Sequence, residues 1–122
     1  MDTKRDTGDQ YEDLALEHLK RNGLKLIKRN HLCKGGEIDL VMLDGTTLAL
    51  IEVRFRRNRS HGGAAASVTA TKRRRITIAA RHLIQSQKEL QRYRARFDLV
   101  AIEMDDHQQP KVDWIKGAFT LL

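Results

Sequence analysis

Residues 36–54 read GEIDLVMLDGTTLALIEVR, two apolar runs separated by the turn sequence at 44–47. The runs have the composition of strands and the turn that of a hairpin, so the stretch predicts two antiparallel neighbours. Three acids, Glu37, Asp39 and Glu52, interrupt the apolar pattern. An ionised carboxylate buried in a sheet costs several kcal/mol unless a cation compensates for it. These positions therefore indicate a function beyond packing.

The hairpin is expected to bring Asp39 and Glu52 together. In an antiparallel hairpin, the residue numbers of two paired residues add up to a nearly constant value. This rule places Asp39 opposite Glu52, with Arg54 nearby. Strand alternation puts Asp39 on one face and both Ile38 and Leu40 on the other. Clustered carboxylate oxygens suit Mg²⁺ or Mn²⁺, and either ion is the predicted cofactor. A structural salt bridge to a basic side chain is the alternative interpretation.

Length and composition indicate one domain with a mostly aliphatic core, because the chain has 122 residues and only 5% aromatic content. Polar residues 1–9 are predicted to form a flexible N-terminal tail, and residues 10–122 the domain. The single Cys33 excludes an internal disulfide framework and a multi-cysteine zinc site, which fits a cytoplasmic location. The first residues lack the apolar segment of a signal peptide.

Positive charge is concentrated in one part of the chain. Residues 54–96 hold 13 Lys and Arg against one acid, Glu89, a net charge of +12. The remainder holds 10 basic and 15 acidic residues, a net charge of −5. Such segregation favours a polyanionic partner, with nucleic acid ahead of an anionic membrane surface. The alternative is a solvated basic helix face.

Periodicity predicts the remaining elements. Apolar residues at helical spacing predict a helix over 10–22 with Asp9 as N-cap, and another from 67 or 69 to 87. Three further stretches have strand patterns, at 24–32, 96–104 and 111–119. The order αβββαββ predicts an α/β fold in which a central mixed five-stranded sheet packs between helices.

The second helix carries a basic cluster. Lys72 lies four residues before Ile76 on the apolar stripe, so it is expected to face the sheet. Arg73, Arg74 and Arg75 are expected to project sideways or outward, toward solvent or phosphate. The residues predicted to bind nucleic acid are Arg56, Arg57, Arg59, Lys72, Arg73, Arg74 and Arg75.

These residues together resemble a known family. An acid in an opening helix, a D-x(n)-E-x-K pattern across two hairpin strands and a following helix with Lys are the layout of the PD-(D/E)XK nuclease superfamily. More closely, the chain resembles the YraN-like family, which is endonuclease-related and similar in fold to archaeal Holliday-junction resolvases. The matching motifs are E-D-L-A at 12–15, R-N at 29–30, G-E-I-D-L-V at 36–41, I-E-V-R at 51–54, the helix start at 69–72 and R-F-D at 96–98.

The resemblance implies a restriction-endonuclease-like core and roles for five residues. Glu12 would approach the site from the first helix, and Asp39 and Glu52 would bind the metal. Arg54 stands where the family usually has lysine, and Lys72 would assist from the second helix. A bound metal ion beside a basic groove is the smallest set of groups that phosphodiester hydrolysis requires. The implied activity is a metal-dependent endonuclease acting on structured or branched DNA.

Two other functions remain open at this point. Arginine stays protonated and cannot act as a general base, so Arg54 keeps open a nucleic-acid-binding module that does not cut. A basic protein of RNA or ribosome particles is a third reading. By analogy with resolvases, which are dimers, an exposed edge strand makes a homodimer a further expectation. The five histidines lack zinc-site spacing and are expected to be structural or solvated.

Overall fold

A computed structural model describes the backbone of residues 3–56 and 68–120, and the side chains of residues 8–55 and 68–120. In chain order the elements are α1 (Thr3–Arg21), β1 (Lys25–Cys33), β2 (Gly36–Asp44), β3 (Thr47–Arg56), α2 (Ala70–Ser86), the short 3₁₀ helix η2 (Lys88–Arg92), β4 (Arg94–Met104) and β5 (Pro110–Phe119). The predicted order αβββαββ is confirmed, and η2 is an addition that the sequence pattern did not reveal.

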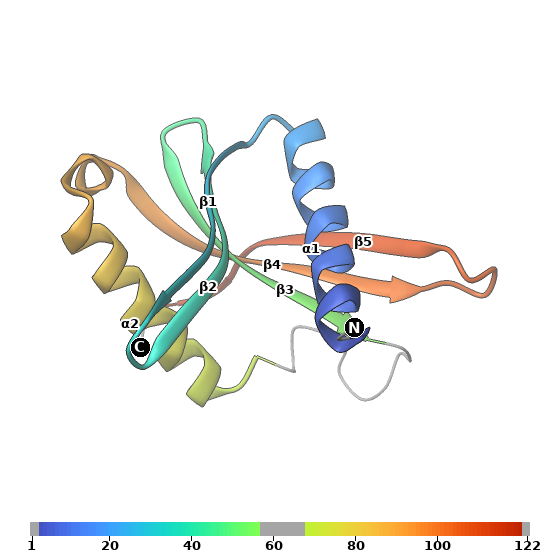
Figure 1. Ribbon diagram of the computed structural model, residues 1–122. Coiled ribbons are helices and arrows are strands. Elements are labelled where there is room, and N and C mark those ends of the chain that lie inside the picture. The colour runs from blue at the N-terminus through green and yellow to red at the C-terminus, as the bar shows by residue number, and fades with distance from the viewer. Residues whose placement is uncertain (1–2, 57–67, 121–122) are drawn as a thin grey trace.

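The five strands form one mixed sheet in the order β1-β2-β3-β4-β5. Neighbouring strands are antiparallel except β3 and β4, which run parallel. A parallel pair needs a crossover connection, and α2 lies in it. Figure 1 shows α1 and α2 on opposite sides of the sheet. The result is the predicted α/β arrangement, consistent with a restriction-endonuclease-like core.

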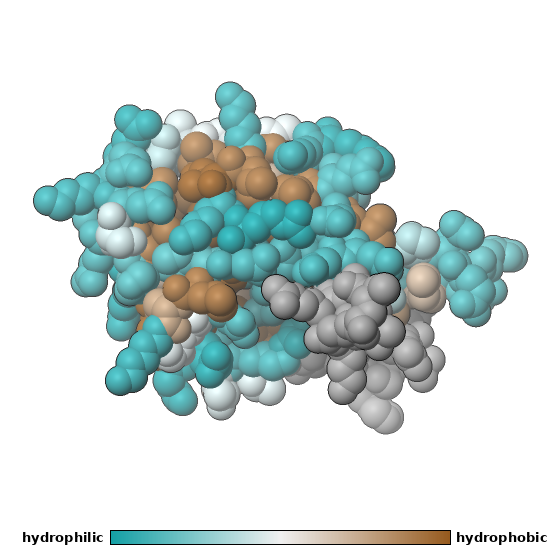
Figure 2. All heavy atoms as spheres, viewed as in Figure 1, coloured by the Kyte–Doolittle hydropathy of each residue, from teal (hydrophilic) through white to brown (hydrophobic). Residues whose placement is uncertain are grey.

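Two apolar clusters fill the layers on either side of the sheet. On the α1 side the buried residues include Ala15, Leu19, Leu40, Met42, Ile51 and Ile102. On the α2 side they include Ile38, Val41, Leu50, Ile76, Ala79 and Leu83. The face seen in Figure 2 is mostly hydrophilic, with apolar side chains gathered over β1 and beside α1. Each helix therefore packs against the sheet through one apolar face.

The first helix is longer than predicted. It begins at Thr3, so residues 3–9 are helical rather than a tail, and Asp9 lies inside the helix instead of capping it. Once a helix is nucleated, each further residue adds a hydrogen bond, so the helix extends beyond its apolar stretch. No helix within the described part of the chain is long and apolar enough to cross a membrane.

The regular alternation of β2 breaks at Asp39. Leu40 belongs to the α1-side cluster, whereas Ile38 belongs to the α2-side cluster, so the prediction that they share a face is wrong. The neighbouring strand is distorted at the same level, because Asn30 has a φ of 54° between the paired positions Arg29↔Leu40 and His31↔Ile38. A residue with a left-handed backbone interrupts the pleat of the sheet. At this level the alternation of side chains between the two faces of the sheet is broken.

Gly36 allows β2 to begin directly against α2. A Cβ at this position would collide with the carbonyl oxygen of Arg75 and lie 2.9 Å from the backbone nitrogen of Ala79. Only glycine permits this close approach of backbone to backbone. The contact positions the N-terminal half of α2 beside the start of β2, where Glu37 follows.

Candidate nuclease-like site

Asp39 and Glu52 meet where β2 and β3 stop pairing. The regular ladder ends at Leu40↔Ile51, and beyond it Asp39 Oδ2 accepts a hydrogen bond of 2.8 Å from the backbone N–H of Val53. The Glu52 carboxyl group lies close enough to Asp39 for the two to interact electrostatically. Burial, then the charge and hydrogen bond of Asp39, raise the pKa of Glu52 to about 8, against a lowering effect of Arg54. Around neutral pH Glu52 therefore retains its proton in the metal-free protein.

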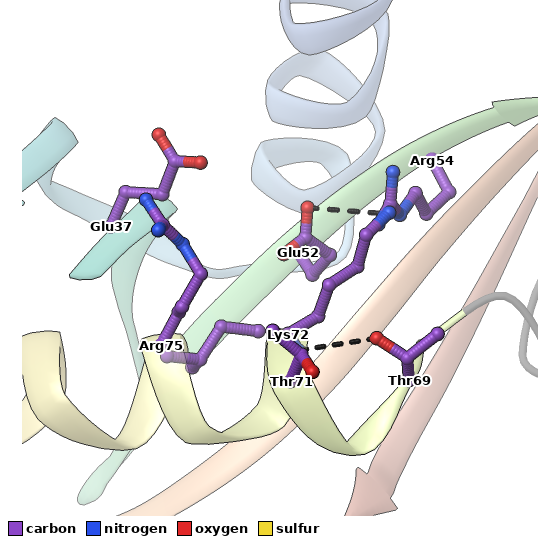
Figure 3. A pocket seen from close by; sticks show the side chains of 8 residues that line it. Glu37, Glu52, Arg54, Thr69, Thr71, Lys72 and Arg75 are labelled. Carbon is purple, nitrogen blue, oxygen red and sulfur yellow. Dashed lines mark hydrogen bonds and ion pairs between the residues drawn. The ribbon is translucent and has the colours of Figure 1, made fainter. Parts of the chain in front are cut away.

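Glu52 opens onto a cleft of about 340 Å³ between the sheet and the start of α2. We call it the α2 cleft; its lining residues are Glu37, Glu52, Arg54, Thr69, Thr71, Lys72, Arg75 and Ile76. Figure 3 shows these side chains converging from β2, β3 and α2. Three cations and two acids line one concavity, so the cleft offers several charged groups to a ligand.

Arg54 is incompletely paired within this cleft. Its Nε lies 3.9 Å from Glu52 Oε1, at the outer limit of an ion pair. The same Nε is buried and has no hydrogen-bond partner among the described residues. A buried guanidinium donor without a partner costs free energy, and such groups in native proteins call for an explanation. A phosphate oxygen from a ligand would satisfy it.

Lys72 faces the sheet, as the helical spacing predicted. Thr69 is the N-cap of α2, and its Oγ1 accepts a hydrogen bond of 3.2 Å from the Lys72 backbone nitrogen. The cap fixes the first turn, which places Lys72 in the lining of the α2 cleft with Glu52. The positive end of the helix dipole adds to the charge of Lys72 there.

The other predicted basic residues are distributed differently. Arg75 is exposed but lines the α2 cleft, and Arg74 is exposed. Arg73 is half-buried, and among the described residues its Nε has no hydrogen-bond partner. The three arginines therefore differ in exposure, with Arg73 the least exposed of them. The Arg56 side chain, and Arg57 and Arg59 entirely, lie outside the described residues.

Glu12 lies on the α1 side of the sheet and is only 8% exposed. Its Oε1 accepts hydrogen bonds from Arg29 Nε at 3.0 Å and from Asn30 Nδ2 at 3.1 Å. Burial raises the pKa of Glu12, and the hydrogen bond from Arg29 works in the opposite direction. Sequence analysis assigned no role to Arg29 and Asn30, although the R-N motif at 29–30 was the available signal. The left-handed backbone of Asn30 presents its amide to the helix acid.

A second cavity, of about 300 Å³, contains Glu12 and Asp39 in its walls. We call it the α1 pocket; its lining residues are Gly8, Asp9, Tyr11, Glu12, Asp39, Val53 and Phe55. The five predicted catalytic residues thus divide between two cavities. Glu12 and Asp39 border the α1 pocket, while Glu52, Arg54 and Lys72 border the α2 cleft. The Asp39–Glu52 contact joins the two.

Asp39 and Glu52 are suited to a divalent ion that takes only one or two of its ligands from protein carboxylates. Among the described residues, no group of three or more His, Cys, Asp or Glu side chains is placed to hold a metal. Asp39 and Glu52 nevertheless lie side by side, and the raised pKa of Glu52 marks a place where a positive charge is favourable. Mg²⁺ is commonly bound by one or two carboxylates, with water and substrate phosphates completing the shell. Two acids beside a cationic cleft suit that pattern.

The mixed sheet, the element order and the strand-borne acids together define an α/β protein with a restriction-endonuclease-like core. The chain belongs to the family described as "Uncharacterised protein family UPF0102", the YraN family, whose model matches residues 11–102. It is 44% identical over 119 residues to a UPF0102 protein of Pseudomonas aeruginosa strain LESB58, covering 97% of this chain and 95% of that one. A UPF0102 protein of Ectopseudomonas mendocina strain ymp is 45% identical over 119 residues, 98% of each chain. The family resemblance is confirmed.

Proposed function

We propose that this protein is a metal-dependent endonuclease that binds and hydrolyses structured or branched DNA. The observation that supports it most is the pairing of Asp39 with Glu52, two half-buried acids beside a cationic cleft, of which Glu52 has a pKa raised to about 8 by burial and by Asp39. A fold that only needed stability would gain little from this pair, because desolvating carboxyl groups is expensive. Perturbed titratable groups of this kind in a cleft are typical of functional sites.

Asp39 and Glu52 would hold Mg²⁺ or Mn²⁺. When bound there, such an ion supplies Lewis-acid activation of water and offsets the charge of the phosphate. The chain's own part is to orient the ligands. The Val53 N–H holds Oδ2 of the Asp39 carboxylate from the backbone, which fixes the orientation of that side chain beside Glu52.

Arg54 and Lys72 would bind the phosphate that is cleaved. Arg54 Nε has no hydrogen-bond partner in the described part of the chain, and a phosphate oxygen is a suitable acceptor. Lys72 contributes a second positive charge from the first turn of α2. Both groups would stabilise negative charge that develops in the transition state. Arg75, at the rim, would contact the flanking backbone, and the net charge of +12 over residues 54–96 would draw in the polyanion.

Cleavage of labelled DNA tests the proposal. Purified protein is incubated with four-way junction, flap, duplex and single-stranded DNA, with Mg²⁺, Mn²⁺ or EDTA. We expect metal-dependent cutting of the branched substrates that Asp39→Asn and Glu52→Gln each reduce by at least 100-fold. Glu17→Gln is the matched control, since Glu17 is an exposed acid on α1 paired with Arg21. Cutting that survives both site substitutions would contradict the proposal.

Arg54 favours one alternative, a nucleic-acid-binding module of the same fold without turnover. Arginine cannot serve as a general base, whereas the lysine usual at this place can. In that case the wild type binds branched DNA and leaves it intact with either metal. Arg54→Lys separates the two functions: a gain of cutting would indicate a module that has lost its base, while a loss of cutting would assign the arginine to the enzyme's own phosphate site.

A further inference from the structure

We propose that the α1 pocket is a nucleobase site, which holds an unpaired base next to the phosphate in the α2 cleft. The inference rests on the proposed function for the position of that phosphate. It adds a substrate feature: the preferred nucleic acid has an unpaired nucleotide at the site of cleavage. The argument uses the wall of the pocket, its charge and its connection to the Asp39–Glu52 contact.

An aromatic pair forms one wall of the pocket. Tyr11 of α1 and Phe55 of β3 stack with ring centroids 3.9 Å apart and an angle of 8° between their planes. Both rings are only partly buried and line the cavity, together with Val53. A partly exposed stacked pair offers an apolar surface of the kind on which bases stack in single-strand-binding proteins. The cavity has a volume of about 300 Å³.

The charge of the pocket excludes a phosphate and suits a base. The described residues that line the pocket include three acids, Asp9, Glu12 and Asp39, and no basic residue. The α2 cleft, in contrast, contains Arg54, Lys72 and Arg75. A bound nucleotide would therefore place its anionic phosphate in the α2 cleft and its neutral base in the α1 pocket.

Carboxylate oxygens can also recognise the base edge. Acids accept hydrogen bonds from exocyclic amino groups such as N4 of cytosine. Glu12 is 8% exposed and uses Oε1 for Arg29 and Asn30, while its Oε2 has no hydrogen-bond partner in the described structure. Asp9 is exposed at the rim. Bases with an amino group are therefore favoured over thymine.

The connection between the cavities limits the substrate. Asp39 borders the α1 pocket and touches Glu52, which borders the α2 cleft, so base and phosphate belong to adjoining positions. A base stacked in a continuous duplex cannot enter a side pocket without being unpaired and turned out. Junction centres, flaps and loops contain bases that are already unpaired, so little free energy is needed to turn one out into the pocket. Branched structure would thus be recognised through one accessible base.

Abasic substitution tests the pocket without relying on cleavage. Fluorescence anisotropy measures the binding of labelled single-stranded and flap DNA in the presence of Ca²⁺. Each intact strand is compared with otherwise identical strands that have a single abasic site, placed at a different position in each strand. We expect one abasic position to weaken binding by roughly 5- to 100-fold, the effect of losing one stacked base. Tyr11→Leu, which keeps an apolar side chain against Phe55, should remove this difference, and melting temperature verifies that it folds. Tyr93→Leu, a partly buried tyrosine outside the pocket, is the matched control.

The outcomes separate this inference from the proposed function. Equal binding of intact and all abasic strands by the wild type overturns the nucleobase site, even if metal-dependent cutting is observed. A base-dependent affinity that Tyr11→Leu abolishes supports the site, even if no DNA is cut and the endonuclease proposal fails. A base-dependent affinity that Tyr11→Leu leaves intact, in a folded variant, also overturns the assignment to this pocket.

Discussion

The backbone N–H of Val53 donates to Asp39 Oδ2 at 2.8 Å, so a side chain continues the hydrogen bonding where the β2–β3 ladder ends. This bond has two consequences. It satisfies a backbone donor that the separating strands would leave unpaired, and it aims the carboxylate at Glu52. Asp39 is thus a structural residue as well as a candidate ligand, and its substitutions must be chosen to distinguish the two roles.

Asp39→Asn and Asp39→Ala should differ in stability but not in metal response. The amide oxygen of Asn can still accept from Val53, whereas Ala leaves the N–H unpaired, which costs about 1–3 kcal/mol. We expect urea unfolding to show this loss for Ala and little change for Asn. Mn²⁺ should raise the melting temperature of the wild type and of neither variant. Full Mn²⁺ stabilisation of Asp39→Asn would rule out Asp39 as a ligand.

The contribution of Glu52 to the stability of the metal-free protein should decrease with increasing pH. The pKa of Glu52 rises from 4.5 to about 8 on folding, so between these values the folded state holds a proton that the unfolded chain has released. The free energy of unfolding contributed by this group therefore falls through that window. Melts in EDTA from pH 5 to 9 measure the effect. Glu52→Gln should flatten the slope, and Glu17→Gln should retain it.

Metal binding should show the opposite pH dependence. The ion must displace the proton on Glu52, so Mn²⁺ affinity should increase as pH rises toward 8. Calorimetric titration in buffers of different ionisation enthalpy reports the proton released. An affinity that is constant from pH 6 to 8.5, without proton release, would place the metal elsewhere.

His31 should make the protein less stable in acid. Lys28 Nζ lies 3.1 Å from His31 Nδ1, and His31 Nε2 lies 3.0 Å from His82 Nδ1. An ammonium only donates, so Nδ1 accepts and Nε2 donates to His82. Burial, Lys28 and His82 lower the pKa of His31 from 6.5, so stability present above pH 6.5 is lost as the pH falls below it.

Urea unfolding at pH 5, 6 and 7 measures this loss as the difference between the wild type and His31→Gln, because the opposing contribution of Glu52 is common to both. His31→Gln removes the titrating group and should lose less stability than the wild type toward pH 5. His107→Gln, in the exposed β4–β5 turn, is the control and should behave like the wild type. An unchanged acid dependence in His31→Gln would show that another group is responsible.

Gly36→Ala should displace α2 from β2. The added Cβ meets the Arg75 carbonyl and the Ala79 backbone, neither of which can rotate away. Overpacking of this kind typically costs 1–3 kcal/mol, roughly the effect expected in urea unfolding. DNA cleavage should fall as well, because Lys72 moves with α2. Gly8→Ala, with nothing within 4 Å of its Cβ in helix α1, should not lower stability.

Local pattern was enough for most of the fold. The strands at 36–54 were found from alternation and the turn at Gly45, since both are properties of neighbouring residues. The N-terminal extension of α1 was missed because polar residues 3–9 have no apolar period. The parallel pairing of β3 with β4 gave no local signal, since it depends on how the α2 crossover packs.

The sequence by itself determined the order αβββαββ and the meeting of Asp39 with Glu52, because side-chain period and hairpin register are short-range geometry. Only the tertiary structure decided that β2 changes face at Asp39 and that the acids lie between two cavities. It also decided that Glu12 is held by Arg29 and Asn30, residues 17 and 18 positions away. Such contacts depend on helix packing against a distorted strand, which no local periodicity encodes.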